Sequence, residues 1–193
     1  MGSHHPPERP AADVVRFHRL WGEHAASVLA YSRRLVDRDM AEEVVSETFL
    51  VAWRRLQDVP DPALPWLLGV ARNTAANIRR ASGRQDAVQS ELVRLQHVID
   101  FVPAVDVGVT ERAELREALA RLTPSEREAL LLTSWDGLSA RQAARVAGCS
   151  PSAMYVRLHR ARRRLRQGAP NPSASAPSTC PESAYPAGVP DEA

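Results

Sequence analysis

The stretch SARQAARVAGCSPSAMYVRLHRARRRLR, residues 139–166, decides the fold of the second half of this chain. Ser139 and Gln142 have the spacing of a capping box, and the Ser-Pro pair at Ser150 is typical of a helix start. Between them, Gly148 can take the left-handed conformation that ends a helix. The pattern therefore predicts a short helix, a tight turn and a longer helix, which is a helix-turn-helix.

The longer helix has one apolar stripe and one basic side. The stripe contains Met154, Leu158, Ala161 and Leu165, and it is expected to be buried. In a recognition helix, residues near the start reach base edges and later arginines contact phosphates. The position of His159 fits a DNA-binding histidine and a histidine that only faces solvent equally well. The candidate DNA-binding residues are Ser150, Ser152, Tyr155, Val156, His159, Arg160 and Arg163.

Charge is distributed unevenly along the chain. The net charge is only +2, yet residues 137–167 hold eight arginines and no acidic residue. A block of this kind is typical of a surface that binds a polyanion such as DNA. A solvated basic face is the alternative that this block alone leaves open.

Residues 39–56, DMAEEVVSETFLVAWRRL, predict an amphipathic helix in the first half. Its apolar face consists of Ala41, Val44, Val45, Thr48, Phe49, Ala52, Trp53 and Leu56. Glu42, Glu43 and Glu47 lie near its start, where acids suit the helix dipole. These exposed acids could also dock a basic partner. Trp21 and Trp53 are expected to belong to the hydrophobic core.

A proline-rich loop, DVPDPALP, precedes a basic helix expected near residues 65–80. Asn73 and Asn77 stand four residues apart on one face of that helix, although asparagine is a poor helix former. Their amides can pair with base edges. A stiff loop beside such a helix could form a pocket for an unpaired base.

The fold class expected is all-α, with two small helical domains joined by a flexible linker. The expected boundaries are a disordered N-terminus at 1–12, helical domains at 13–81 and 111–167, a linker at 82–110, and a disordered Pro/Ala/Ser-rich tail at 168–193. The opening MGSHH is typical of an expression tag and is left out of the prediction. The tail is expected to be dispensable for folding.

Several function classes are not supported by the sequence. Cys149 and Cys180 lack metal-ligand or disulfide spacing, and no phosphate loop, metal cluster or nucleophile–base pair is present. No apolar run approaches the ~18 residues of a membrane helix. We therefore expect a cytoplasmic protein without catalytic residues, metal, cofactor or membrane insertion.

The two halves together resemble the extracytoplasmic-function (ECF) sigma factors of the sigma-70 family. AEEVVSETFLVAWRRL resembles the sigma-two helix that docks on the β′ clamp of RNA polymerase. PWLLGVARNTAANIRR resembles the segment that melts and reads the −10 element. Residues 122–165 resemble sigma-four, which reads the −35 element and contacts the β flap. The order and spacing of these motifs are more specific than any one of them.

The resemblance implies a transcription initiation factor that brings core RNA polymerase to promoter DNA and is held inactive by an anti-sigma factor. It implies a −10 site and a polymerase-binding face. The −10 candidates are Trp66, Arg72, Asn73, Asn77 and Arg80, and the polymerase-binding candidates are Glu42, Glu43, Glu47 and Leu50. The alternative is a helix-turn-helix regulator that acts on duplex DNA without polymerase, which would leave the first half unexplained.

Overall fold

The computed structural model describes residues 10–81 and 109–168, and all regular secondary structure in this part of the chain is helical. The first half contains α1 (Ala11–Arg33), α2 (Arg38–Arg54), the 3-10 turn η1 (Leu56–Asp58) and α3 (Leu64–Ala81). The second half contains α5 (Val109–Ala120), α6 (Pro124–Ser134), α7 (Ala140–Val146) and α8 (Pro151–Gly168). The expected all-α fold class is confirmed. The expected linker, tail and N-terminus lie largely or wholly outside the described residues.

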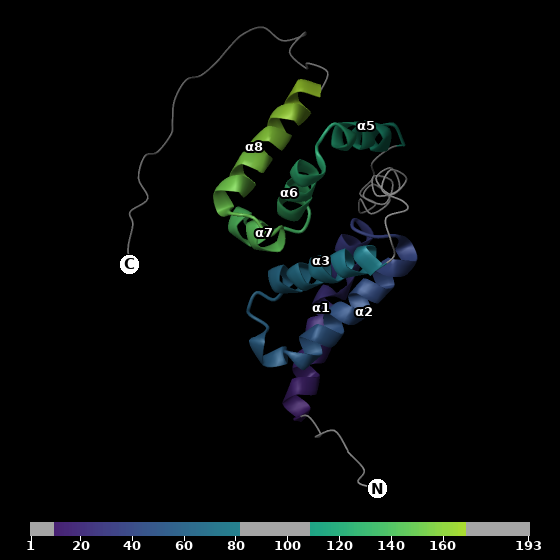
Figure 1. The fold of residues 1–193 in the computed structure, drawn as a ribbon, viewed down its shortest axis with the longest axis vertical. Coiled ribbons are helices and arrows are strands. Elements are labelled where there is room, and N and C mark those ends of the chain that lie inside the picture. The colour runs from purple at the N-terminus through teal and green to yellow at the C-terminus, as the bar shows by residue number, and fades with distance from the viewer. Residues whose placement is uncertain (1–9, 82–108, 169–193) are drawn as a thin grey trace, which may run out of the picture.

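The helices form two groups that meet at α3 (Figure 1). In the first group, α1, α2 and α3 pack pairwise against one another. In the second group, α8 packs on α6 and α7, while α5 lies at the end away from α7. The two groups are in contact, because α7 packs along α3. None of the described helices combines the length and apolar character that crossing a membrane requires.

Local capping signals explain the helix starts in the second group. At the start of α6, the Thr123 hydroxyl accepts from the Glu126 N–H at 3.3 Å, and the Glu126 carboxylate accepts from the Thr123 N–H at 3.0 Å. Ser139 and Gln142 form the same reciprocal pair at the start of α7. Gly148 has φ +63°, so the turn between α7 and α8 uses the left-handed region that favours glycine. The predicted helix-turn-helix is present.

We expect Thr123→Ala to lower the free energy of unfolding by ~1 kcal/mol, because the start of α6 loses its side-chain cap. Chemical denaturation followed by circular dichroism measures this change. Ser134→Ala, at the opposite end of α6, is the control and should change stability by less than about 0.5 kcal/mol. Equal losses from the two variants would contradict the capping argument.

The predicted apolar faces are largely buried. In α8, Met154, Leu158 and Ala161 are buried and Leu165 is half-buried. The apolar face of α2 is buried except at Trp53, which is half-buried and packs its ring edge-on against Phe17. The prediction for Trp21 was wrong, since this side chain is 44% exposed. Trp21 lies on the outside of α1 and covers Phe49, with ring centroids 4.5 Å apart.

One apolar cluster runs through both helix groups. It contains residues of the first group, such as Tyr31, Leu68 and Ala75, and residues of the second group, such as Leu132 and Met154. A smaller cluster under α5 contains Leu119, Leu122, Leu131 and Ala161. The two groups therefore share packing in this structure, which the helix patterns of the sequence did not indicate.

Candidate nucleic-acid interface

The proline loop and the first turns of α3 border a cavity of about 430 Å³. Pro60 and Pro62 of the loop line it, together with Pro65, Trp66 and Asn73 of α3. Prolines fix the backbone and remove N–H donors, so this loop is a stiff wall. Asn73 is exposed, and its amide adds a donor and an acceptor to a mixed lining that also contains the charged residues Arg55 and Asp61. A flat ring with polar edges fits this combination chemically.

The other predicted −10 residues do not join this cavity. Asn77 and Arg80 are exposed one to two turns further along α3, where Arg80 Nη2 donates to Asn77 Oδ1 at 2.5 Å. Arg72 instead faces the second helix group, and its Nε donates to Glu128 Oε1 at 2.9 Å. That hydrogen bond is the main cause that raises the pKa of Arg72 above its usual value, although partial burial opposes it.

Two cavity residues come from the second helix group. Gln142 and Arg145 of α7 also line this cavity. The sequence assigned Gln142 only to a helix cap and Arg145 only to the basic block, so their place here was missed. Helix periodicity carries no signal for a contact between elements that lie 70 residues apart.

The predicted DNA-binding face of α8 is exposed along its whole length. Tyr155 is 58% and Val156 is 47% exposed, and His159, Arg160 and Arg163 are exposed as well. Ser150 has a structural task in addition, because its hydroxyl accepts from the Ala153 N–H at 3.2 Å and caps the helix. The face therefore presents an apolar and aromatic start followed by arginines.

α8 is also linked to α6 by an ion pair. Arg164 Nη1 lies 3.0 Å from Oε2 of Glu126, whose side chain is only 5% exposed. Glu126 is the same residue that closes the α6 capping box. Arg127 of α6 donates to the carbonyl oxygens of Leu119 and Leu122, both at 3.0 Å, and so ties α6 to the end of α5. The Arg164–Glu126 pair and the packing of α8 on α6 and α7 leave the arginine-rich face of α8 exposed.

The acidic face of α2 is a separate surface. Glu42, Glu43 and Glu47 are exposed, and Leu50 on the same helix is 38% exposed. A shallow apolar groove between α1 and α2 adjoins Leu50, with an accessible volume of about 430 Å³. It is lined by Val14, Phe17, His18, Trp21, Ser46, Phe49, Leu50 and Trp53. Acids beside exposed apolar side chains are typical of a protein-binding surface.

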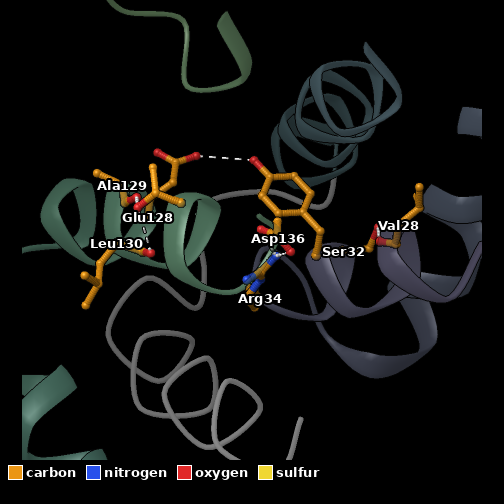
Figure 2. A network of polar contacts seen from close by, with 9 residues as sticks. Val28, Ser32, Arg34, Glu128, Ala129, Leu130 and Asp136 are labelled. Atoms are coloured by element: carbon orange, nitrogen blue, oxygen red, sulfur yellow. Dashed lines mark hydrogen bonds and ion pairs between the residues drawn. The ribbon is translucent and has the colours of Figure 1, made fainter. Parts of the chain in front are cut away.

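The two helix groups are joined by a polar network. Arg34 Nη2 donates to both carboxylate oxygens of Asp136, at 2.8 and 2.6 Å (Figure 2). The Tyr31 hydroxyl donates to Glu128 Oε1 at 3.3 Å. Burial raises the pKa of Tyr31, and the nearby Glu128 carboxylate adds to this shift. The sequence held one hint, since Glu128 and Asp136 are the last acids before the acid-free block, but it did not show their partners.

Each helix group matches a known protein family model. A family model described as Sigma-70 region 2 matches residues 20–85, and one described as Sigma-70, region 4 matches residues 112–165. The chain thus has the two-part architecture of a sigma-70 initiation factor. The ECF RNA polymerase sigma factor SigL of Mycobacterium tuberculosis is 34% identical over 163 residues, which cover 81% of this chain and 90% of SigL. This chain belongs to the ECF sigma factors, as its motifs indicated.

Other relatives agree with this assignment. The RNA polymerase sigma factor CarQ of Myxococcus xanthus is 30% identical, with 78% of this chain and 87% of CarQ covered. The solved structure of CnrH in complex with the cytosolic domain of CnrY has a TM-score of 0.52 and 26% identity, covering 78% of this chain and 85% of that chain. The sigma factor RpoE of Bartonella quintana, with a TM-score of 0.58 and 24% identity over 79% of this chain and 95% of that one, shares the fold. As a sigma factor, the chain binds core RNA polymerase and directs promoter-specific transcription initiation.

Proposed function

We propose that the cavity between the proline loop and α3 holds one unpaired base of the −10 element. The observation that carries this proposal is that Trp66 and Asn73 line one cavity with the loop prolines. An aromatic or apolar wall can stack on any base, while an amide recognises the polar edge of a particular one. Holding a base outside the stack favours the melted promoter, so melting proceeds on binding energy without ATP hydrolysis.

We assign the −35 element to the exposed face of α8. Ser152, Tyr155 and Val156 lie at the start of the helix, where base edges are within reach. Arg160 and Arg163 lie further along and suit phosphates. Polymerase docking falls to the acidic face of α2, where Glu42, Glu43 and Glu47 offer charge and Leu50 offers apolar contact. A charged rim around apolar side chains gives a surface its specificity and its rate of association.

Three further assignments concern catalysis, location and an inhibitory partner. The protein acts as a binding factor and not as an enzyme, in the cytoplasm where bacterial polymerase works. CnrH was solved in complex with the cytosolic domain of CnrY, and we propose that this chain also has a protein partner, the anti-sigma factor that its family resemblance implies. A duplex-binding regulator that works without polymerase is disfavoured, because it gives no task to the cavity or to the acidic face of α2.

The −10 assignment is tested by scanning abasic sites through a single-stranded −10 oligonucleotide bound to the polymerase complex. One position should cost the wild type about 10-fold in affinity, because one base loses its stacking and hydrogen bonds. In Asn73→Ala the same abasic site should cost clearly less, while the cost at every other position stays unchanged. A uniform loss at all positions would show that Asn73 only supports the fold.

The −35 assignment predicts a salt effect. Replacing Arg163, a phosphate-binding candidate, with alanine should weaken binding to all duplexes alike and reduce the slope of log K against log salt by ~1. Fluorescence anisotropy at several salt concentrations, on matched and scrambled −35 duplexes, measures both effects. Arg121→Ala on α5 is the control, since Arg121 is exposed but paired with Glu117 at 2.7 Å. An unchanged slope in Arg163→Ala would remove Arg163 from the interface.

A further inference from the structure

A further cavity, of about 340 Å³, lies where the two helix groups are in contact. Its walls come from the end of α1, from α3, from α6 and from α8. Among the described residues, five arginines line it: Arg34, Arg72, Arg79, Arg127 and Arg157. The lining also contains the carboxylate of Glu128. Even when Asp136, the partner of Arg34, is counted, arginines outnumber carboxylates here by five to two.

The arginines of this cavity are held in place by the surrounding structure. Carboxylates bind Arg34 and Arg72, as described above. Backbone carbonyl oxygens accept from Arg127, and the Ala75 carbonyl oxygen accepts from Arg79 Nε at 3.3 Å. A carbonyl oxygen has no net charge, so such a contact orients a guanidinium group without neutralising it. Like charges gathered in a partly buried cavity repel one another, which favours an anion between them.

Two donors of this arginine cluster have no acceptor. Arg157 is half-buried, and it makes no hydrogen bond or ion pair with any residue in the described part of the chain. The Arg34 side chain is only 9% exposed, and its Nε is buried without a hydrogen-bond partner. Buried donors are nearly always hydrogen-bonded in folded proteins. Two such groups at one cavity indicate that the cavity takes a ligand with acceptor atoms.

The cavity also has an apolar side. Leu35, Leu131 and Leu132 line it together with Pro124 and Ala147. Its volume falls within the range of about 300–1,000 Å³ that is usual for small-molecule sites, which combine apolar walls with a few polar groups. The guanidinium group is planar and matches the spacing of phosphate oxygens. The lining therefore suits a small molecule with a phosphate end and an apolar or ring-shaped end.

We propose that this cavity is a binding site for a small phosphorylated molecule. The phosphate oxygens accept from Arg157 and Arg79, and the apolar end lies against the leucines. Neither arginine belongs to the candidate −10 or −35 residues, so the site is separate from the proposed promoter surfaces and does not depend on them. Because both helix groups contribute to the lining, the ligand binds only the folded chain and stabilises it.

Isothermal titration calorimetry on the full chain, without polymerase or DNA, tests the site. The probes are ADP, pyrophosphate and adenosine. ADP should bind with one site per chain, and adenosine should bind at least about 10-fold more weakly, because it lacks the charge-assisted hydrogen bonds of the phosphates. ADP should also raise the melting temperature of the chain. Binding of neither phosphate compound, or equal binding of adenosine, would overturn the proposal.

Substitution of the lining arginines locates the binding. Arg157→Ala and Arg79→Ala should each weaken ADP binding about 10-fold or more, since each removes a charged donor to the phosphates. Arg162→Ala is the matched control, because it makes the same charge change at an exposed position of α8 outside the cavity. Circular dichroism verifies the helices of each variant. An equal loss in Arg162→Ala would show a diffuse attraction to the basic surface and overturn the site.

A cavity-filling variant separates a small molecule from the phosphates of DNA. Ser125 is half-buried and lines the cavity, so Ser125→Trp places an indole in the space without removing an arginine. This variant should lose ADP binding and keep the wild-type affinity for a −35 duplex. Loss of both would assign the cavity to DNA phosphates and overturn the small-molecule proposal. If Ser125→Trp unfolds, the arginine variants and their control decide the proposal independently.

Discussion

Core RNA polymerase should bind the Glu43→Arg/Glu47→Arg double variant about 100-fold more weakly than the wild-type chain. Both glutamates are exposed on α2 beside Leu50, so reversal changes the docking charge without disturbing buried packing. A like charge set against a basic partner costs more than the lost attraction, at ~1 kcal/mol or more for each position. Titration of labelled core enzyme by fluorescence anisotropy measures the affinity, and thermal unfolding verifies the isolated fold.

The control for this variant is Glu114→Arg/Glu117→Arg on α5, which makes the same charge change on exposed helix positions in the other half. It should retain nearly all of the wild-type affinity. Since exposed ion contacts are screened by salt, the deficit of the α2 variant should also shrink as ionic strength rises. Wild-type affinity in the α2 variant would show that this face does not dock the polymerase.

Asn73→Ala should slow open-complex formation about 10- to 30-fold on a duplex promoter. The side chain is exposed, and α3 does not use its amide for packing, so the helix should keep its fold. The expected loss corresponds to one or two hydrogen bonds to an unpaired base at ~1 kcal/mol each. Permanganate footprinting of thymines near the start site follows melting over time.

A template already mismatched across the −10 bases isolates the melting step. The Asn73→Ala defect should become smaller there, because strand separation no longer has to be driven. Closed-complex binding to the −35 duplex should be the same in variant and wild type. An unchanged footprint on the fully paired template would exclude the −10 role of Asn73, as the regulator alternative predicts.

Local signals in the sequence predicted the elements well. The capping boxes at Thr123 and Ser139 and the left-handed turn at Gly148 depend only on residues a few positions apart. The sequence alone is therefore enough to predict them. The buried stripe of α8 follows from a period of 3.6 residues. The proline loop and Asn73 are also close in the sequence. Together they predicted a pocket, and a cavity is present there.

Long-range placement was beyond these signals. The apolar pattern of α1 does not distinguish a tryptophan inside the core from one that covers the core. The exposure of Trp21 depends on where α2 packs. Arg72 was assigned to nucleic acid because it precedes Asn73. Its hydrogen-bond partner in the structure is Glu128, which lies 56 residues further along the chain. Contacts between surfaces follow from shape and charge in three dimensions, which periodicity along one helix does not encode.

The central claim is that this chain makes core RNA polymerase promoter-specific, and run-off transcription tests it most directly. Purified core enzyme, free of other sigma factors, is combined with the chain and a library of genomic fragments, and transcript starts are mapped. The account predicts discrete starts that share −35 and −10 elements and disappear when either element is scrambled. Sequence-specific binding of the chain to duplex DNA without any chain-dependent start would contradict the account and favour a regulator that works without polymerase.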